Sequence, residues 1–386
     1  MTLPPPQDPY GPPPQGGGVP SWGAQPQAQY GPPQGPPTGP PQWGQQSQWS
    51  GPPLPPPSKG GRGKWILGGV AVLVVIALAV VITVLVMRPS GGGGPTPTPT
   101  NGNSDFASAN DTGPVNIIAE DPTCEAWGKV AREYADATTA VNWGNRDQSV
   151  AASSWTSDQR TRYEAVGKAL VRAAGQTGDL AKQTPHRVMR ELYEQFIAYG
   201  RAFAAKIPSY VADDGNLAVV TDTITTATAN VCSAIDYRSA PAIAPLIPIP
   251  PGPSELSSPG DADSPSRFLP ASNDICSEWE SAGQKFSDDT EQWRALDPKI
   301  SATDWTPEQK AVNDAAAPIM ADNAKELERM GRQSHNPTLE DFAVLAAQYR
   351  RAFVAAIPNY TSADDFLSGT AAELVRAVTW ACKAAA

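Results

Sequence analysis

The residues that could carry acid–base chemistry are few, and most recur at matched positions of the chain. The sequence has 2 histidines, His186 and His335, which fall one position apart in aligned segments. The matched acids are Glu191 with Asp341 and Asp214 with Asp364. A histidine can act as a base, and paired carboxylates can exchange protons. Acids near helix N-termini normally interact with the helix dipole, so we favour a structural role for the acids and solvated loops for the histidines.

A second set of recurring residues could bind a ligand instead of catalysing a reaction. Two matched arginines could anchor an anion, or pair with the matched acids across a helical bundle; we favour the pairing. The matched tryptophans are most simply core residues. The candidate site residues are Arg201, Arg351, Trp155, Trp305, Tyr210 and Tyr360.

Catalytic and cofactor motifs do not occur in the sequence. It contains no GxSxG elbow, no phosphate-binding GxxxxGK loop, no HExxH pair and no dinucleotide-binding fingerprint. We therefore assign no catalytic residue, no cofactor and no metal ligand. The net charge is −10, and nearly all acids lie beyond Arg88, which argues against nucleic acid as a partner.

The C-terminal two-thirds of the chain contain an internal duplication. It predicts two repeats, 114–238 and 271–386, separated by a Pro-rich linker at 239–270. Each is long enough for its own core. The matched segments are Cys124–Trp127 with Cys276–Trp279, Trp155–Gln159 with Trp305–Gln309, Tyr199–Phe203 with Tyr349–Phe353, and Ile207–Tyr210 with Ile357–Tyr360.

Apolar residues in each repeat recur every three to four positions, which is typical of helices. One such stripe runs over 189–207 and returns at 339–357. Thr156 with Gln159 predicts a capping box, and the second repeat has the same pair at Thr306 and Gln309. Pro318 lies inside a predicted helix and should kink it.

The 4 cysteines lie one near the start and one near the end of each repeat. Four cysteines allow three pairings. In an up-down-up-down bundle the first helix begins and the fourth ends at the same pole. This favours bridges Cys124–Cys232 and Cys276–Cys382. A four-cysteine metal site is the rival interpretation, but the sequence has no CxxC pair.

The segment 65–87 is apolar and uncharged, which predicts one transmembrane helix. A basic cluster at 59–64, with Lys59, Arg62 and Lys64, precedes it, and Arg88 follows. This asymmetry predicts an N-terminus in the cytoplasm and repeats on the extracytoplasmic side of the cell membrane. The predicted fold class is therefore all-α, with a disordered Pro-rich arm, one transmembrane helix and two tandem disulfide-closed four-helix-bundle-like repeats.

The first 58 residues are rich in Pro, Gly and Gln and too polar to form a core. They predict a disordered cytoplasmic arm, which is either a ligand for a Pro-rich-motif-binding protein or a solvated spacer; we favour the spacer. Residues 88–113 form a Gly/Pro/Thr linker whose Thr–Pro alternation could carry sugar.

The plan of the first hundred residues resembles that of uncharacterised proline-rich, single-pass envelope proteins of mycobacteria and related actinobacteria. The features that carry the resemblance are the arm with Tyr10-Gly-Pro-Pro13, the basic cluster before one span, and the linker from Gly91 to Thr100. The resemblance implies an envelope location and no particular activity.

These observations favour a non-catalytic cell-envelope protein whose duplicated outer helices bind an envelope protein or ligand, or act as a scaffold. The first alternative is a ligand-binding envelope sensor that signals through the arm. The second is an envelope hydrolase without a recognisable motif. Recurrence of packing residues, without a recurring nucleophile–base set, favours the binding role.

Overall fold

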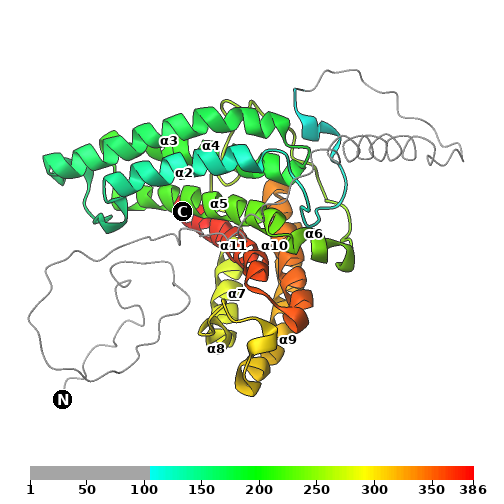
Figure 1. Ribbon diagram of the computed structural model, residues 1–386. Helices are drawn as coiled ribbons and strands as arrows, with labels where there is room; N and C mark the ends of the chain where they lie inside the picture. The colour runs from blue at the N-terminus through cyan, green and yellow to red at the C-terminus, as the bar shows by residue number, and fades with distance from the viewer. Residues whose placement is uncertain (1–104) are drawn as a thin grey trace, which may run out of the picture. The chain divides into compact units, whose positions relative to one another are not determined.

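The structure, a computed structural model, describes residues 105–386 (Figure 1). The predicted arm (1–58), basic cluster (59–64), membrane segment (65–87) and the linker as far as 104 lie outside the described residues. The described part consists of helices, turns and loops and has no strand.

The first repeat has four long helices in the predicted order. They are α2 (Cys124–Ala140), α3 (Ser157–Gln183), α4 (Arg187–Lys206) and α5 (Gly215–Asp236), followed by the short α6 (Ser239–Ile243). Successive helices pack on one another, and α2 also packs on α5. This arrangement closes the ring of a four-helix bundle.

The second repeat follows the same plan with one shorter helix. Its elements are α7 (Cys276–Asp289), α8 (Glu291–Arg294), α9 (Pro307–Gln333), α10 (Pro337–Ala356) and α11 (Asp365–Ala385). Helix α7 buries only Trp279, whereas the matching α2 buries Cys124, Trp127, Val130 and Tyr134. The first helix of this repeat is therefore held less tightly than its counterpart.

Local signals in the sequence explain where the helices begin. Thr156 and Thr306 accept hydrogen bonds from the backbone N–H of Gln159 and Gln309, and both capping boxes are complete. These two predictions are confirmed. Pro318 lies inside α9 as predicted, and the helix continues past it to Gln333.

The cysteines are bridged within each repeat. The disulfides are Cys124–Cys232 and Cys276–Cys382, with Cα–Cα distances of 5.3 and 5.6 Å. They join the start of the first helix to the end of the fourth, which is the pairing that the bundle argument predicts. No cysteine is free in the described residues.

The predicted transmembrane helix is not supported, and the fold class is corrected accordingly. Among residues 105–386, no helix is both long and apolar enough to cross a membrane. The physical reason is that the long helices here are amphipathic, with one face buried and charged residues on another. The segment 65–87 itself lies outside the described residues. The fold is thus all-helical and duplicated, with no membrane-spanning helix in the described part.

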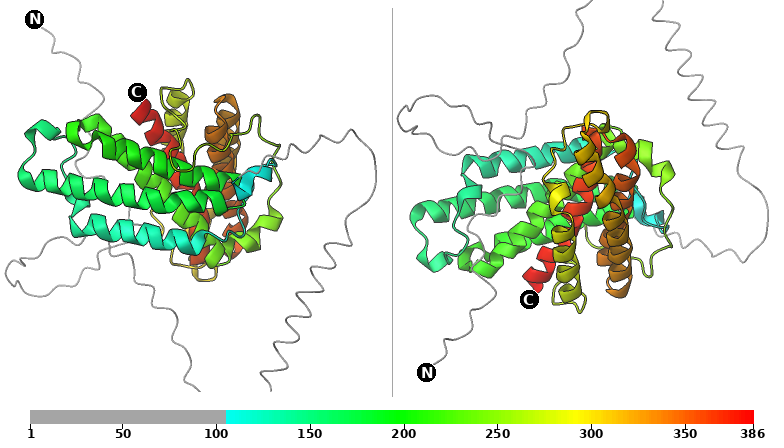
Figure 2. Two further views of the ribbon diagram at one scale, coloured as in Figure 1. Left: turned by 90° about the horizontal axis from the view of Figure 1, so that it is seen from above. Right: turned by 90° about the horizontal axis from the view of Figure 1, so that it is seen from below.

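The two repeats pack against each other instead of standing apart as separate bundles. Helices α5 and α11 lie side by side between them, as Figures 1 and 2 show. Helices α4 and α10 also meet. Every residue is buried from Arg187 to Gly200 on α4 and from Thr338 to Arg350 on α10. These two helices are covered by their own bundle and by the other repeat.

The segments that precede each bundle are exchanged between the repeats. Phe268, just before repeat 2, donates its backbone N–H to Gln195 Oε1 on α4 of repeat 1, at 2.8 Å. Asn116, which precedes α2 of repeat 1, accepts at Oδ1 from Gln348 on α10 of repeat 2, at 3.1 Å. The stretch predicted as a linker, 239–270, therefore contains α6 and residues that pack into the interface, among them the buried Leu269.

Candidate functional site

The structure brings together two of the predicted residues in each repeat. Trp155 stacks on Tyr210 with ring centroids 5.5 Å apart, and Trp305 stacks on Tyr360 at 5.6 Å. The matched pairs occupy the same corner of each bundle, where the loop before the second long helix meets the turn after the third. Duplication has therefore preserved an aromatic corner.

The polar atoms of these pairs are used to hold the corner closed. In repeat 2, Trp305 Nε1 donates to the Ile300 carbonyl at 2.9 Å, and the Tyr360 hydroxyl donates to the Pro298 carbonyl at 2.6 Å. Burial raises the pKa of Tyr360, so this hydroxyl stays protonated. The four aromatic residues therefore fix loop positions.

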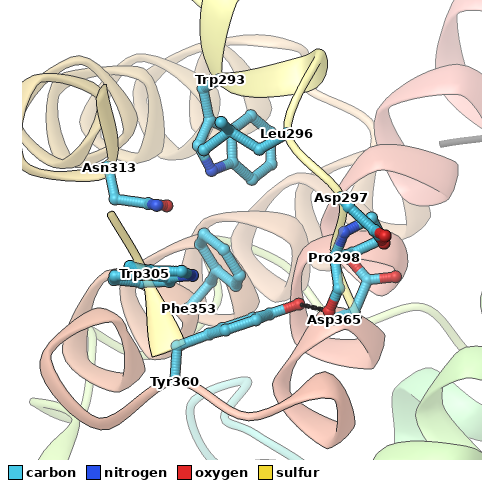
Figure 3. A pocket seen from close by; sticks show the side chains of 9 residues that line it. All are labelled: Trp293, Leu296, Asp297, Pro298, Trp305, Asn313, Phe353, Tyr360 and Asp365. Atoms are coloured by element: carbon cyan, nitrogen blue, oxygen red, sulfur yellow. Dashed lines mark hydrogen bonds between the residues drawn. The ribbon is translucent and has the colours of Figure 1, made fainter. Parts of the chain in front are cut away.

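A small cavity opens at this corner in repeat 2 (Figure 3). Its volume is about 30 Å³, far below the roughly 300 Å³ at which small-molecule sites begin. Asn313 stands here where repeat 1 has Tyr163, whose ring stacks 4.1 Å from Trp155 and fills the corresponding space. The nine lining residues are Trp293, Leu296, Asp297, Pro298, Trp305, Asn313, Phe353, Tyr360 and Asp365.

Asp365 is the chemically unusual group of this cavity, and sequence reasoning missed it. Burial raises its pKa to about 6, and repeat 1 has Gly215 at the matching position. A carboxyl with this pKa can exchange a proton near neutral pH. The cavity leaves no room for a substrate beside it, so we assign Asp365 no catalytic role.

The matched arginines do not make the predicted ion pairs. Arg351 Nη2 lies 2.6 Å from Glu328 Oε2 on α9, and its Nη1 donates to Gln348 Oε1 at 2.7 Å. Arg201 is half-buried, and within residues 105–386 it makes no ion pair. The preference for pairing with Glu191/Asp341 or Asp214/Asp364 was wrong, because the acids of α9 lie closer to Arg351 than these acids do.

The matched acids Glu191 and Asp341 instead belong to a buried ionic cluster at the interface between repeats. Arg187 of α4 holds Asp341 of α10 with two hydrogen bonds, Nε to Oδ2 at 2.6 Å and Nη2 to Oδ1 at 3.2 Å. Arg187 Nη1 also donates to the Asp111 carbonyl at 2.6 Å. Burial, and then repulsion from Asp341, raises the pKa of Glu191 well above its ordinary value. This cluster joins the repeats and is closed to solvent.

The histidines behave as the sequence predicts for loop residues. His186 is the N-cap residue of α4; it is half-buried, and its Nε2 is 2.8 Å from the Glu120 carbonyl oxygen. His335 lies in the turn before α10 with a positive φ of 50°. Within the described part of the chain, no group of His, Cys, Asp or Glu side chains could hold a metal ion.

A second, larger and more open feature than the cavity beside Asp365 is a groove between α7 and α9, which sequence reasoning also missed. It has a volume of about 510 Å³. Its lining residues recur at helical spacing on two facing helices: Glu278, Ser281, Ala282, Lys285, Phe286 and Asp289 on α7, and Ile319, Asp322, Asn323 and Glu326 on α9. A comparison of the two repeats position by position could have found it.

An uncompensated cation lies behind this groove. The guanidinium of Arg350, on α10, is 4.1 Å from the ring centroid of Phe286, a lining residue. Arg350 is buried, and no carboxylate in the described residues pairs with it; burial lowers its pKa to about 10, so it is charged at neutral pH. Asn323 Oδ1, in the groove lining, is also buried and has no hydrogen-bond partner.

These features define a class of protein: a duplicated, disulfide-closed helical protein. Its two repeats have matching core residues and differ at the open groove between α7 and α9. The chain belongs to a family described as mycobacterial ESX-1 associated protein, which matches residues 106–386. It is 47% identical over 283 residues to an uncharacterised protein of Mycolicibacterium smegmatis (strain MKD8). The match covers 73% of this chain and 75% of that relative. No solved structure matches the chain.

Proposed function

We propose that residues 105–386 form a non-catalytic binding body that associates with a component of the ESX-1 secretion system. The observation that carries this proposal is that the family match, 106–386, coincides with the duplicated helical body. We therefore assign the ESX-1 association that the family name describes to this helical body.

The distribution of polar groups favours binding over catalysis. Arg187 and Asp341 hold the two repeats together, and the aromatic corners hold loops. The cavity beside Asp365 is about 30 Å³, too small for a substrate. The groove between α7 and α9, at about 510 Å³, falls in the range of ligand sites.

We also propose that this body works outside the cytoplasm. Both disulfides close long loops, with sequence separations of 108 and 106 residues, and such bonds persist in oxidising compartments. An envelope location would place the body where a secretion system could contact it.

The test is genetic. In a mycobacterium lacking this gene, we expect ESX-1-dependent protein secretion into the medium to fall several-fold and to return with the wild-type chain. Variants that remove two of the candidate acid–base groups, Asp365→Asn and His186→Ala, should complement fully. Unchanged secretion in the deletion strain would contradict the association. A folded Asp365→Asn protein that fails to complement would contradict the non-catalytic assignment.

A further inference from the structure

We propose that the groove between α7 and α9 binds an amphipathic helix of a partner protein, apolar on one face and basic along both flanks. This inference deepens the proposed function, on which it rests, by naming the surface and the kind of partner. It is drawn from the comparison of this groove with the matching seam of repeat 1.

In repeat 1 the same seam is closed. Val130 and Tyr134 of α2 are buried against α3 and the core. Gln176 of α3 donates to Glu133 Oε2 of α2 at 3.2 Å across the surface. The Tyr134 hydroxyl also donates to Asp222 Oδ1 of α5 at 3.1 Å. Side-chain packing and two hydrogen bonds therefore hold α2 against its neighbours.

Repeat 2 has lost each of these contacts. Ala282 stands where repeat 1 has Val130, and Phe286, without a hydroxyl, stands for Tyr134. Lys285 and Glu326 occupy the positions of Glu133 and Gln176, but each pairs along its own helix, with Asp289 and Arg329 respectively. A new ion pair, Glu278 of α7 with Arg329 of α9, joins the two helices at the surface. The smaller Ala282 and the loss of the other cross-seam contacts still leave the groove open.

The shape of the groove suits a helix. Its lining on α7 runs from Glu278 to Asp289, which at ~1.5 Å per residue is roughly 17 Å, or about three helical turns. The lining residues of α7 and α9 recur at three- and four-residue intervals, so two helix faces form its walls. Ala282, Phe286 and Ile319 supply the apolar contact that an amphipathic helix uses in helix-in-groove recognition.

The charge of the groove specifies the flanks of its occupant. Four lining residues are acidic: Glu278, Asp289, Asp322 and Glu326. Each has a basic neighbour, since Lys285 pairs with Asp289, Lys325 with Asp322, and Arg329 with both Glu278 and Glu326. These pairs are at the surface, where ion pairs are weak and can exchange partners, and four acids against three bases leave the rim net negative. At the four matching positions repeat 1 has Ala126, Ala137, Arg172 and Gln176, none of which is acidic. The acids are thus a property of the open groove and not of the shared framework. They complement basic flanks and repel anionic amphiphiles.

The inner wall is incomplete without an occupant. Asn323 Oδ1 has no hydrogen-bond partner, although a buried polar atom normally has one. A polar side chain on the apolar face of the bound helix would supply the missing donor. This requirement distinguishes a helix with one central amide or hydroxyl from a purely aliphatic stripe.

The test uses the purified full chain and fluorescein-labelled 16-residue helical peptides with a leucine face, a central glutamine, and either lysine or glutamate flanks. We expect the lysine-flanked peptide to bind at least tenfold more tightly in low salt. The preference should shrink in 0.5 M salt, because exposed charges are then screened. Equal binding of the two peptides would overturn the proposal, as would their displacement by dodecanoate, which would assign the groove to lipid.

Matched variants locate the binding. Ser281 and Lys129 are exposed and occupy the same position in the two repeats, so Ser281→Trp should fill the groove and Lys129→Trp should leave it open. We expect at least tenfold weaker peptide binding for Ser281→Trp and no change for Lys129→Trp, with both melting temperatures near that of the wild type. Asp322→Arg, which installs the residue of repeat 1, should reduce the lysine preference about threefold. Wild-type affinity in Ser281→Trp would overturn the proposal.

Secretion assays separate this inference from the proposed function. If deletion of the gene abolishes ESX-1-dependent secretion and the folded Ser281→Trp chain restores it fully, the groove proposal fails and the association stands. If deletion changes nothing, the association fails, while peptide binding still decides whether the groove accepts a helix.

Discussion

The guanidinium of Arg187 and the carboxylate of Asp341 form a buried ion pair that joins the two repeats, with Nε 2.6 Å from Oδ2. Their side chains are 3% and 1% exposed. A buried pair gains little over an apolar pair, but loss of one partner leaves an uncompensated charge. The pair therefore makes the relative placement of the repeats specific. A shifted interface would separate the two charges, and no water reaches this site to solvate either of them.

The first prediction concerns this pair. Asp341→Ala should destabilise the protein by about 3–5 kcal/mol, because Arg187 would stay buried without its carboxylate. Arg187→Met should be comparable. The double variant should cost at least 1 kcal/mol less than the two single costs together. Urea denaturation of all four proteins measures this coupling.

An exposed pair provides the control. Lys129 and Glu125 lie 2.8 Å apart one helical turn from each other, at the surface of α2. The same double-variant cycle on these residues should show no measurable coupling. Strict additivity for Arg187 and Asp341 would contradict a direct stabilising interaction across the interface.

The second prediction concerns the pH dependence that Asp365 imposes. Burial raises its pKa from 3.8 to about 6, so the folded state binds a proton that the unfolded state releases between these values. Stability should therefore fall as pH rises from about 4 to 6 and stay lower above it. Asp365→Asn should add about 1–2 kcal/mol at pH 7.5, since one pKa unit is worth ~1.4 kcal/mol and the helix dipole offsets part of the gain.

Thermal melts at pH 4 and pH 7.5 measure this effect. The gain should vanish at pH 4, where Asp365 is protonated in the folded protein. Asp213→Asn changes an exposed acid of repeat 1 and should leave the melting temperature unaltered at both values. A stabilisation by Asp365→Asn that is equal at the two pH values would show that burial of charge is not its cause.

The third prediction concerns the two disulfides. Removing either bond should cost about 2–5 kcal/mol. The two losses should differ in how local their effect is. Helix α7 buries only Trp279 and depends on its disulfide, whereas α2 is also held by the buried Trp127 and Tyr134. Replacing Cys276 and Cys382 by serine should therefore release residues 276–294 selectively.

Hydrogen–deuterium exchange is the measurement for this prediction. In the repeat 2 variant, amides of α7 and α8 should exchange much faster while α9 to α11 stay protected. The corresponding change at Cys124 and Cys232 should lower the melting temperature without a selective release of α2. Equal local exchange in α2 and α7 would contradict the proposed difference in packing.

The fourth prediction concerns Pro318. It is exposed and lies inside α9, where it cannot donate a backbone hydrogen bond; repeat 1 has Lys168 at this position. Pro318→Lys should stabilise the protein by about 1–3 kcal/mol, because an interior proline costs ~3 kcal/mol and no packing is lost. Pro307→Ser, at the first residue of the same helix, should change stability little. A fall in melting temperature for Pro318→Lys would show that the proline supports the native path of α9.

Much of the helical framework was predictable because it rests on local signals. Apolar residues three to four positions apart predicted the helices. Thr156 with Gln159 predicted the start of one helix, which the structure confirms. The two disulfides were predictable because the first helix begins and the fourth helix ends at the same end of an up-down-up-down bundle. The predicted transmembrane helix did not find support in the described residues.

The tertiary structure alone decided how the repeats meet. Arg187, Arg190, Glu191 and Glu194 recur at the spacing of one helix face, which in a lone bundle would be a solvated polar stripe. All four are buried here, because Asp341 of the second repeat and the segment between the repeats, at Ser257 and Gly260, cover that face. The ion-pair partner of Arg351 was likewise decided by the tertiary structure, which places Glu328 of α9 within reach of it.

The sequence by itself determined the duplication, the helices and the disulfide framework, because spacing, caps and cysteine order act within one repeat. Only the tertiary structure decided the exchanged leading segments, the Arg187–Asp341 pair and the open groove beside Phe286. Each of these depends on small differences between two similar repeats, such as Val130 against Ala282. Such differences change which surfaces fit together, and fit is set by contacts between residues far apart in the chain.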